Sequence, residues 1–311
     1  MSPGPADPIV VAVVVTHVGH GEMLSDCITS VLDAGGISAL IIVDNSPGSV
    51  AIRTVADVGN DATEVVVVEN RGFGAAVNAG IQAAGHCAFS EADDSVEFYA
   101  VLNDDVTVEP GWLTPLLADI ATDERIGGVQ PKILLAGTGP VLINSVGVVL
   151  DPAGAGSDIG LGEPDGPNFD RASDISIFSG GAVLLSAPFV ADLGGFDERY
   201  FLYYEDVDLA LRGAERGWRF RCVPDSKVHH AASSTTRGLG DEVRRLQERN
   251  RLWTAFRFGS ASTIVRALWL SMRRLRHEPR RIHARALAAG LAGAPIRLFE
   301  RRRAARLNSP S

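Results

Sequence analysis

The stretch that decides the fold lies near the start of the chain and reads Ile9-Val10-Val11-Ala12-Val13-Val14-Val15-Thr16-His17. Its first seven residues are apolar and mostly β-branched, and two polar residues follow directly. A short, continuous apolar run of this kind is typical of a parallel strand that is buried on both faces of its sheet. The sequence therefore predicts that a parallel sheet begins here.

Strand-like and helix-like stretches alternate along the chain after this strand. Apolar residues recur at helical spacing over residues 23–32, and small residues form a helical pattern over 74–84. Apolar runs at 39–43, 65–68 and 98–102 predict further strands. This alternation indicates βαβ units, and so an α/β fold with a mostly parallel central sheet.

Polar residues follow the end of each predicted strand. They are Thr16-His17, Asp44-Asn45, Asn70-Arg71 and Asn103-Asp104-Asp105. In open parallel sheets, ligands bind at the edge formed by the carboxyl ends of the strands. Four strand ends with polar side chains therefore predict a binding site at that edge.

The second half of the body has a different pattern. Residues 137–174 are rich in Gly, Pro and Asp and predict long loops, with a hairpin around 146–150. A helix is expected over 205–215, with Gly217 past its end.

Composition and charge exclude several classes of protein. The 311 residues are 46% hydrophobic and 22% charged, which is a globular composition. Three cysteines without C-x-x-C spacing argue against a disulfide framework and a zinc ribbon, and fit a reducing compartment. No run of 18 apolar residues predicts a membrane span, and no basic region precedes the first apolar run as in a secretory signal. A cytoplasmic protein is expected.

The charge is divided unevenly along the chain. From Arg237 to the end there are 18 arginines, no lysine and five acidic residues. The rest of the chain carries 11 basic and 33 acidic residues. An acidic body with a basic end indicates that the end meets an anionic surface: lipid headgroups, nucleic acid or another protein.

Three groups of residues could carry chemistry, and each also has a structural interpretation. Asn103-Asp104-Asp105 offers oxygen ligands for Mg²⁺ or Mn²⁺, or forms a solvated turn. Glu205-Asp206 offers a general base, or caps the first turn of a helix. His229-His230 places at most one imidazole at the site, as a metal ligand or as a hydrogen-bonded core residue.

Two other motifs fail in detail. Gly72-Phe73-Gly74 has Val77 at the third glycine position of the dinucleotide-binding motif and follows the third strand, which disfavours NAD or FAD. No G-x-S-x-G motif occurs, which disfavours hydrolase chemistry.

Taken in order, the segments resemble an inverting family 2 glycosyltransferase of the GT-A fold, close to the bacterial rhamnosyltransferases. The resemblance covers about residues 9–235, and the ordered set is more specific than any one segment. The matching segments are residues 13–17 (through Thr16-His17), 41–46 (through Asp44-Asn45-Ser46), 70–80 (Asn70-Arg71-Gly72-Phe73-Gly74 onward), 102–106 (around Asn103-Asp104-Asp105), 194–198 (Gly194-Gly195-Phe196-Asp197-Glu198), 204–209 (around Glu205-Asp206-Val207-Asp208) and 223–230 (ending in His229-His230).

The resemblance implies where the nucleotide sugar binds. Thr16 and Asp44 would line the pocket for the base and the ribose. Asn70, Gly72 and Asn78 would form the second wall of that pocket.

The resemblance also implies a divalent metal, Mg²⁺ or Mn²⁺, on the donor diphosphate. Asp105 would hold it, with His230 as the second protein ligand. The family's D-x-D pattern begins here with Asn103, so an amide would make the ribose contact of the first acid. Asp104 is placed with Asn103 on the nucleotide sugar, and Asp105 is preferred over Asp104 as the metal ligand.

The remaining roles concern the acceptor. Asp206 would deprotonate the acceptor hydroxyl, with Glu205 beside it. Gly180 and Gly181 would let the backbone approach the acceptor. The resemblance favours dTDP-rhamnose as the donor, with UDP-sugars (galactofuranosyl or N-acetylglucosaminyl transfer) open. A glycan or a polyprenyl-linked molecule would be the acceptor. A non-catalytic, membrane-associated nucleotide-sugar-binding protein is the alternative from another class.

The expected organisation is a GT-A catalytic domain over residues 1–235 and a basic, amphipathic helical region over 236–311. In the second region, apolar and aromatic residues at helical spacing are flanked by arginines, which is typical of helices lying in a membrane interface. The alternative is a helical appendage that packs on the body and has a solvated basic face. A membrane surface is favoured over nucleic acid, because the body is acidic and has no nucleic-acid-binding motif. The expected location is the inner face of the cell membrane, on its periphery.

Overall fold

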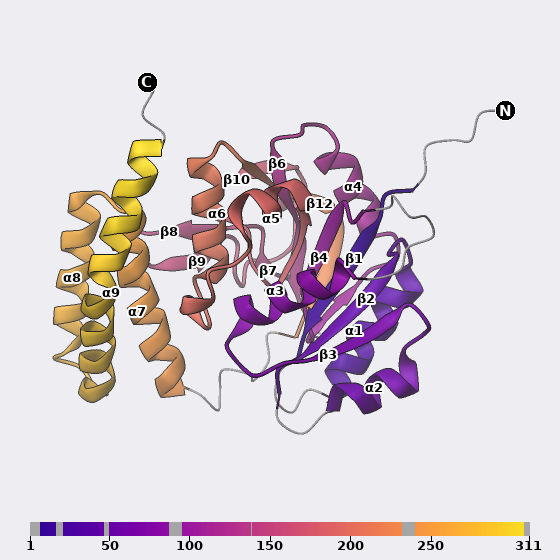
Figure 1. The fold of residues 1–311 in the computed structure, drawn as a ribbon, viewed down its shortest axis with the longest axis horizontal. Coiled ribbons are helices and arrows are strands. Elements are labelled where there is room, and N and C mark those ends of the chain that lie inside the picture. Colours follow the sequence, from indigo (N-terminus) through magenta and orange to yellow (C-terminus); the bar gives the residue numbers. More distant parts are fainter. Residues whose placement is uncertain are drawn as a thin grey trace.

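The computed structural model describes residues 7–16, 21–46, 50–86, 95–137, 139–231 and 240–307. Figure 1 shows an α/β body with three long helices, α7, α8 and α9, side by side at one end. The strands are β1 (Val10–Val15), β2 (Ala39–Asp44), β3 (Thr63–Val67), β4 (Phe98–Asn103), β5 (Val106–Val108), β6 (Ile126–Leu135), β7 (Leu142–Ser145), β8 (Val148–Leu150), β9 (Gly156–Asp158), β10 (Ser173–Ile175), β11 (Ala182–Ser186) and β12 (Arg219–His230). The α-helices are α1 (Gly21–Ala34), α2 (Val50–Val58), α3 (Phe73–Ala84), α4 (Leu113–Ile120), α5 (Ala187–Leu193), α6 (Glu205–Glu215), α7 (Gly240–Phe258), α8 (Ala261–Arg274) and α9 (Arg280–Leu307).

The main sheet has the strand order β10-β12-β6-β11-β4-β1-β2-β3. The block β3-β2-β1-β4 is parallel, as the sequence predicts, and β6 and β12 also run parallel to each other. β11 is antiparallel to both β4 and β6, and so joins the two parallel parts. The chain moves outward from β1 to β3 and then returns to the other side of β1 as β4, which puts the change of direction between β1 and β4. Ligands bind at such a point.

β1 lies at the centre of the core, and all six of its residues are at most 1% exposed. Alternate side chains of a strand point to opposite faces. Val10, Ala12 and Val14 therefore join a cluster with α1, and Val11, Val13 and Val15 join a cluster with α3 and α6. Burial on both faces explains the unbroken apolar run of the sequence.

Several expected elements are present with nearly the predicted bounds. α6 spans Glu205–Glu215, and the predicted hairpin is formed by β8 and β9. The loop-rich region 137–174 is more ordered than the sequence indicates, because the short strands β7 and β10 pair with the long strands β6 and β12. Strands of three or four residues leave little periodicity to detect.

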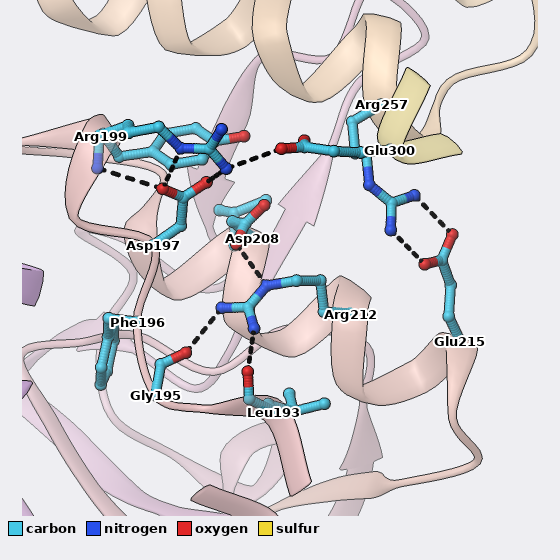
Figure 2. A network of polar contacts seen from close by, with 12 residues as sticks. Leu193, Gly195, Phe196, Asp197, Arg199, Asp208, Arg212, Glu215, Arg257 and Glu300 are labelled. Carbon is cyan, nitrogen blue, oxygen red and sulfur yellow. Dashed lines mark hydrogen bonds and ion pairs between the residues drawn. The ribbon is translucent and has the colours of Figure 1, made fainter. Parts of the chain in front are cut away.

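The C-terminal helices pack on the body through a network of charged side chains (Figure 2). Arg199 bonds to Asp197 and also to Glu300 of α9, and Arg257 of α7 pairs with Glu215 of α6 at 2.8 Å. α9 packs along α7, whereas α8 lies farther out (Figure 1). The expected boundary between residues 235 and 236 lies outside the described residues.

Candidate active site

A cleft of about 710 Å³ lies between the edge of the sheet and the C-terminal helices. Seven of the residues selected from the sequence line it together: Asn103, Asp105, Gly180, Gly181, Glu205, Asp206 and, at the end of β12, His230. They come from segments as far apart as 103 and 230 in the sequence. Sheet pairing brings them together, because β5, which directly follows Asp105, pairs with the end of β12.

At one side of the cleft, Asp105 and His230 meet. The Nε2 atom of His230 lies 3.0 Å from Oδ1 of Asp105, and both side chains are largely buried. The other ring nitrogen, Nδ1, lies 2.9 Å from Oδ1 of Asn144 in β7. A hydrogen on Nδ1 donated to Asn144 leaves the lone pair on Nε2, which points at a carboxylate oxygen. Such a pair requires a proton or a metal cation between its two atoms.

The neighbouring histidine has a different environment. The Nε2 atom of His229 lies 2.9 Å from Glu109, and His229 does not line the cleft. The alternation of side chains along β12 therefore turns only His230 toward the site, as the sequence predicts.

The segment Ser179-Gly180-Gly181 separates this pair from Asp206. The backbone N–H of Gly180 donates to Oδ2 of Asp206 at 2.9 Å. A Cβ atom on Gly180 would lie 3.4 Å from Cβ of Asp206, and one on Gly181 would lie 3.9 Å from both Asn103 and His230. The two glycines thus leave an open passage from the Asp105–His230 pair to Asp206.

Asp206 stands in the first turn of α6, where its Oδ1 atom accepts a hydrogen bond from the N–H of Val207 at 2.7 Å. Burial raises the pKa of Asp206 to about 6, in spite of the hydrogen bonds from Gly180 and Val207, which lower it. Burial and the charge of Asp206 raise the pKa of Glu205 further, to about 8. Near neutral pH, Asp206 is therefore mainly ionised while Glu205 holds a proton, which is the state a general base requires.

The loop before α6 is strained. Phe201, Tyr203 and Tyr204 have φ angles of 68°, 64° and 71°, in the left-handed region that side chains disfavour. Leu202 N–H donates to the carbonyl of Tyr200 at 2.9 Å, which closes a tight turn centred on Phe201. Strain of this kind persists only where the surroundings hold the backbone.

A side chain of α7 holds this loop. The Nδ2 atom of Asn250 lies 3.0 Å, 2.9 Å and 2.7 Å from the carbonyl oxygens of Tyr200, Leu202 and Tyr203. Asn250 is 0% exposed. On the other side, the N–H of Phe73 donates to the carbonyl of Phe201 at 2.8 Å. The position of Asp206 thus depends on a residue of the C-terminal helices.

The remaining residues selected from the sequence do not line this cleft. Asp104 is fully buried, so that Asp105, of the two adjacent acids, is the one that reaches the cleft. Thr16 and Asp44 lie next to each other at the ends of β1 and β2, with Thr16 Oγ1 donating to Asp44 Oδ1 at 3.4 Å. Val15 pairs with Asn103 of β4, so this strand edge continues into the cleft.

The second predicted wall is formed mainly by backbone contacts. The Oδ1 atom of Asn70 accepts from the N–H of Gly72 at 3.1 Å. Gly72 has φ 100°, and a Cβ atom there would overlap the backbone of Phe201, so only glycine fits. Asn78 donates to the carbonyl of Phe196 at 3.0 Å and accepts from its N–H at 2.9 Å, which ties α3 to the segment before α6.

Sequence reasoning missed one wall of the cleft. Arg244, Glu248 and Arg251 of α7, Arg274 of α8 and His283 of α9 line it opposite the sheet. The signal for helices was present in the sequence, but the arginines all belong to one basic region. Nothing in their spacing separates those that face the cleft from those that face solvent.

The family model "Glycosyltransferase like family 2" matches residues 7–252. The chain belongs to this glycosyltransferase family. The match extends past the predicted end of the body and into α7.

Relatives of this family 2 chain include glycosyltransferases of Mycobacterium tuberculosis. An N-acetylglucosaminyl-diphospho-decaprenol L-rhamnosyltransferase is 30% identical over 188 residues, which are 54% of this chain and 58% of that protein. A pre-mycofactocin glycosyltransferase is 28% identical over 197 residues, which are 63% of this chain and 37% of that protein. The chain thus matches less than two thirds of the length of these curated relatives.

A solved structure shares the fold. It is a mannosyltransferase from Pyrobaculum calidifontis in complex with GDP-Man and Mn²⁺, with a TM-score of 0.56 and 16% identity. The superposition covers 94% of this chain and 88% of that one. The likeness shows that this family 2 chain has the GT-A fold that its sequence resembles.

No helix among the described residues combines the length and the hydrophobicity that crossing a membrane requires. No cluster of three or more His, Cys, Asp or Glu side chains with the arrangement of a metal site occurs in that part of the chain.

Proposed function

We propose that this chain is an inverting glycosyltransferase that moves a sugar from a nucleotide-sugar donor to a hydroxyl group of an acceptor. The observation that carries the proposal is the convergence of Asp105 and His230 with Asp206 in one cleft. A pair of side chains that can hold a metal and an ionised carboxylate in the same cleft meet the two needs of the reaction. The leaving diphosphate must be stabilised, and the attacking hydroxyl must lose its proton.

Asp105 and His230 fit a divalent cation, Mg²⁺ or Mn²⁺. Asp105 Oδ1 and His230 Nε2 lie 3.0 Å apart, so both atoms could bind one cation. Mg²⁺ sites usually combine one or two protein ligands with phosphate oxygens and water. When bound, the cation supplies positive charge for the diphosphate as it leaves.

Asp206 accepts the proton of the acceptor hydroxyl while the oxygen of that hydroxyl forms a bond to the anomeric carbon of the donor sugar. The bond from that carbon to the diphosphate breaks at the opposite face, which inverts the configuration. The N–H of Gly180, at 2.9 Å from Oδ2, fixes the carboxylate in the direction of the passage. Gly180 and Gly181 leave room for the acceptor beside it.

The proposed donor is dTDP-rhamnose, with UDP-sugars as the second choice. The rhamnosyltransferase among the relatives supports the first choice. Thr16, Asp44 and Asn103 would contact the nucleoside, because they lie along the strand edge that leads into the cleft. Asn70, Gly72 and Asn78 would act on this pocket by holding its second wall, and Asp104 by supporting the turn from below.

A direct test measures the binding of dTDP-rhamnose and UDP-sugars by calorimetry, with Mn²⁺ and with EDTA. We expect Mn²⁺ to tighten the binding of the true donor in the wild type and to have little effect on Asp105→Ala. Gly137→Ala, at an exposed position with no atom within 4 Å of the added Cβ, is the control. Equal affinity of wild type and Asp105→Ala in Mn²⁺ would remove the metal-binding role.

The alternative is a non-catalytic protein that binds nucleotide sugars at a membrane. The ionised Asp206 beside the passage favours the enzyme, because a binding protein has no use for a base there. Turnover of donor in the presence of acceptor decides between them.

We also propose that the acceptor is a glycan or a polyprenyl-linked molecule and that the C-terminal helices meet the inner face of the membrane. Large apolar side chains are exposed on the outer helices: Val265 (65%), Trp269 (56%) and Met272 (53%) on α8, and Ile296 (52%) and Phe299 (66%) on α9. The three on α8 are spaced by four and three residues and so share one face. Exposed arginines flank them, as in helices that bind anionic lipid surfaces.

Vesicle sedimentation tests the membrane contact with the full chain. Trp269→Ser combined with Phe299→Ser should reduce binding to vesicles of anionic phospholipid by at least tenfold. Ile52→Ser, an exposed apolar residue of α2 on the body, is the matched control. If the double variant binds vesicles as the wild type does, the exposed face of α8 and α9 does not bind the membrane. That face would then be in contact with solvent, and the helices would only pack on the body. In that case, residues 236–311 would be a helical appendage of a catalytic domain comprising residues 1–235.

A further inference from the structure

The wall of the cleft that belongs to the C-terminal helices carries an excess of positive charge. Arg244, Arg251 and Arg274 line it, and Glu248 is the carboxylate among the lining residues of these helices. Glu248 is shared, because its Oε1 atom lies 3.3 Å from Arg274 and 2.5 Å from His283. One carboxylate therefore faces three guanidinium groups and an imidazole.

Arg251 is the most unusual member, since it is only 2% exposed and makes no ion pair with any residue that the structure describes. Its Nη1 atom donates to the carbonyls of Ala153 at 3.0 Å and Ala267 at 3.2 Å, and its Nη2 atom donates to Oγ of Ser271 at 2.5 Å. Its Nε atom has no hydrogen-bond partner among the described residues. A buried guanidinium without a carboxylate is costly, so this wall favours an added anion.

The basic wall lies on the same side of the cleft as Asp206. The hydroxyl of Tyr204, two residues before Asp206, donates to the carbonyl of Gly154 at 3.0 Å. The adjacent residue, Ala153, accepts from Arg251. The contacts thus run from Asp206 through Tyr204 and the β8–β9 turn to Arg251. Gly180 contacts Asp206 and Gly181 faces His230, so the contacts of Arg251 lead to the part of the cleft that holds Asp206.

We propose that Arg244, Arg251 and Arg274 form a subsite for a phosphate or diphosphate group of the acceptor. This inference rests on the proposed function, because it takes Asp206 as the group that receives the acceptor proton. Guanidinium groups bind phosphate oxygens through paired N–H donors, which suits a diphosphate near the reacting sugar. The acceptor would thus be a phosphorylated molecule, and the neutral ends of glycans would bind poorly.

The test uses inorganic pyrophosphate as the probe, with EDTA present. Removal of divalent cations weakens the proposed donor side and leaves the arginine wall as the site for the anion. We expect wild-type protein to bind pyrophosphate in calorimetry, and Arg244→Gln with Arg274→Gln to weaken it by at least tenfold. Arg266→Gln, on α8 and exposed but not lining the cleft, should leave the affinity unchanged.

Two further variants keep the test sharp. Arg274→Lys retains the charge and should therefore bind pyrophosphate more tightly than Arg274→Gln does. If substitution at this position weakened binding only by disrupting the fold, the lysine variant would bind as weakly as the glutamine variant. Glu248→Gln removes the carboxylate that shares Arg274 and should tighten pyrophosphate binding. Equal affinity of the wild type and the double glutamine variant for pyrophosphate would overturn the subsite. Weaker pyrophosphate binding by Glu248→Gln would also overturn it, provided that this variant has the Tm of the wild type.

A lipid and a soluble source of the phosphate are separated by farnesyl diphosphate. Tighter binding of farnesyl diphosphate than of pyrophosphate, lost in the double variant, supports a lipid-linked acceptor. Equal binding supports a soluble phosphorylated acceptor. The proposed function itself would fail by a different result. The protein would then not bind nucleotide sugars in the presence of Mn²⁺, irrespective of its affinity for pyrophosphate in EDTA.

Discussion

At the scale of single residues, neighbours in the sequence differ sharply in their surroundings. Asp104 is buried beneath the cleft and Asp105 lines it; His229 pairs with Glu109 and His230 faces Asp105. The motif types were therefore recognisable from the sequence, and so was the alternation in β12. The environment of each carboxylate was not, because it depends on the segments packed around it.

The role of Asp206 is tested by replacing it with asparagine. Asp206→Asn keeps the size and one of the two oxygens that accept from the N–H groups of Gly180 and Val207, but it cannot take up a proton. We expect kcat to fall by about 10²- to 10⁴-fold, with the Kd of the donor unchanged. Enzymatic assay and calorimetry measure the two quantities. Full turnover by the variant would assign the base to another residue.

The pH dependence follows from the raised pKa of Asp206, about 6. The base must be ionised, so kcat should fall as the pH is lowered through about 6. The stability of the fold changes with pH in the opposite direction. The pKa of Asp206 is higher in the folded state than the unfolded value of 3.8. Asp206 therefore favours the folded state at low pH, and this contribution is lost as the pH rises through about 6. Asp206→Asn should therefore raise the Tm at pH 8 and change it little at pH 4. A lower Tm at pH 8 would contradict this.

At the scale of elements, α7 supports the loop that leads to Asp206, the proposed base, on α6. Asn250 bonds to three carbonyls of the strained loop that ends at Tyr204. This contact was invisible in the sequence, since Asn250 and Asp206 belong to different predicted domains. Three strained residues before α6 require such support, and Asn250 of α7 supplies it.

We expect Asn250→Ala to destabilise the fold by about 1–3 kcal/mol, because buried carbonyls lose their donor. It should also lower kcat by at least tenfold, since small shifts of a reacting group are costly, while the donor Kd is unchanged. Denaturant unfolding and steady-state assays measure these effects. Arg245→Ala, which removes an ion pair with Glu242 inside α7 and no contact with the loop, is the control. Loss of stability with kcat intact below the Tm would leave Asn250 with a purely structural role.

The contact of α9 with α7 depends on two glycines. A Cβ atom on Gly293 would lie 2.2 Å from Nε1 of Trp253, and one on Gly290 would lie 2.4 Å from Leu252. Gly293→Ala should therefore destabilise the protein by about 1–3 kcal/mol, which thermal unfolding measures. Gly137→Ala, which meets open space, should be neutral. Equal Tm values for both variants would show that α9 does not pack as described.

At the scale of the whole molecule, the helices are joined to the body by buried charges. Arg297 of α9 is 2% exposed, and it bonds to Asp197 at 2.6 Å and lies over the ring of Tyr200. Burial alone would raise the pKa of Asp197. Hydrogen bonding from Arg199 and the charge of Arg297 outweigh burial and hold this pKa at about 2. The body and the helices thus share one electrostatic network, part of which Figure 2 shows.

Arg297→Ala should lower the free energy of unfolding at pH 7 by about 3 kcal/mol, because Asp197 then loses a buried partner. The folded pKa of Asp197 is below its unfolded value of 3.8, so this stabilisation is complete above pH 4 and is lost as the pH falls toward 2. Urea unfolding at pH 7 and at pH 3 measures the difference between the variant and the wild type. A difference that does not shrink at pH 3 would indicate that Arg297 acts through packing alone.

The sequence by itself determined the parallel sheet, the strand ends that carry the polar residues and, through the order of its segments, the family. These features are local: an apolar run predicts a buried strand wherever it stands. Only the tertiary structure decided that Asp105, His230 and Asp206 share a cleft, that Asp104 and Asn78 do not line it, that Arg251 does, and that Asn250 holds the loop before α6. Contacts between residues 50 or 100 positions apart arise from packing, and periodicity within one element contains no information about what that element packs against.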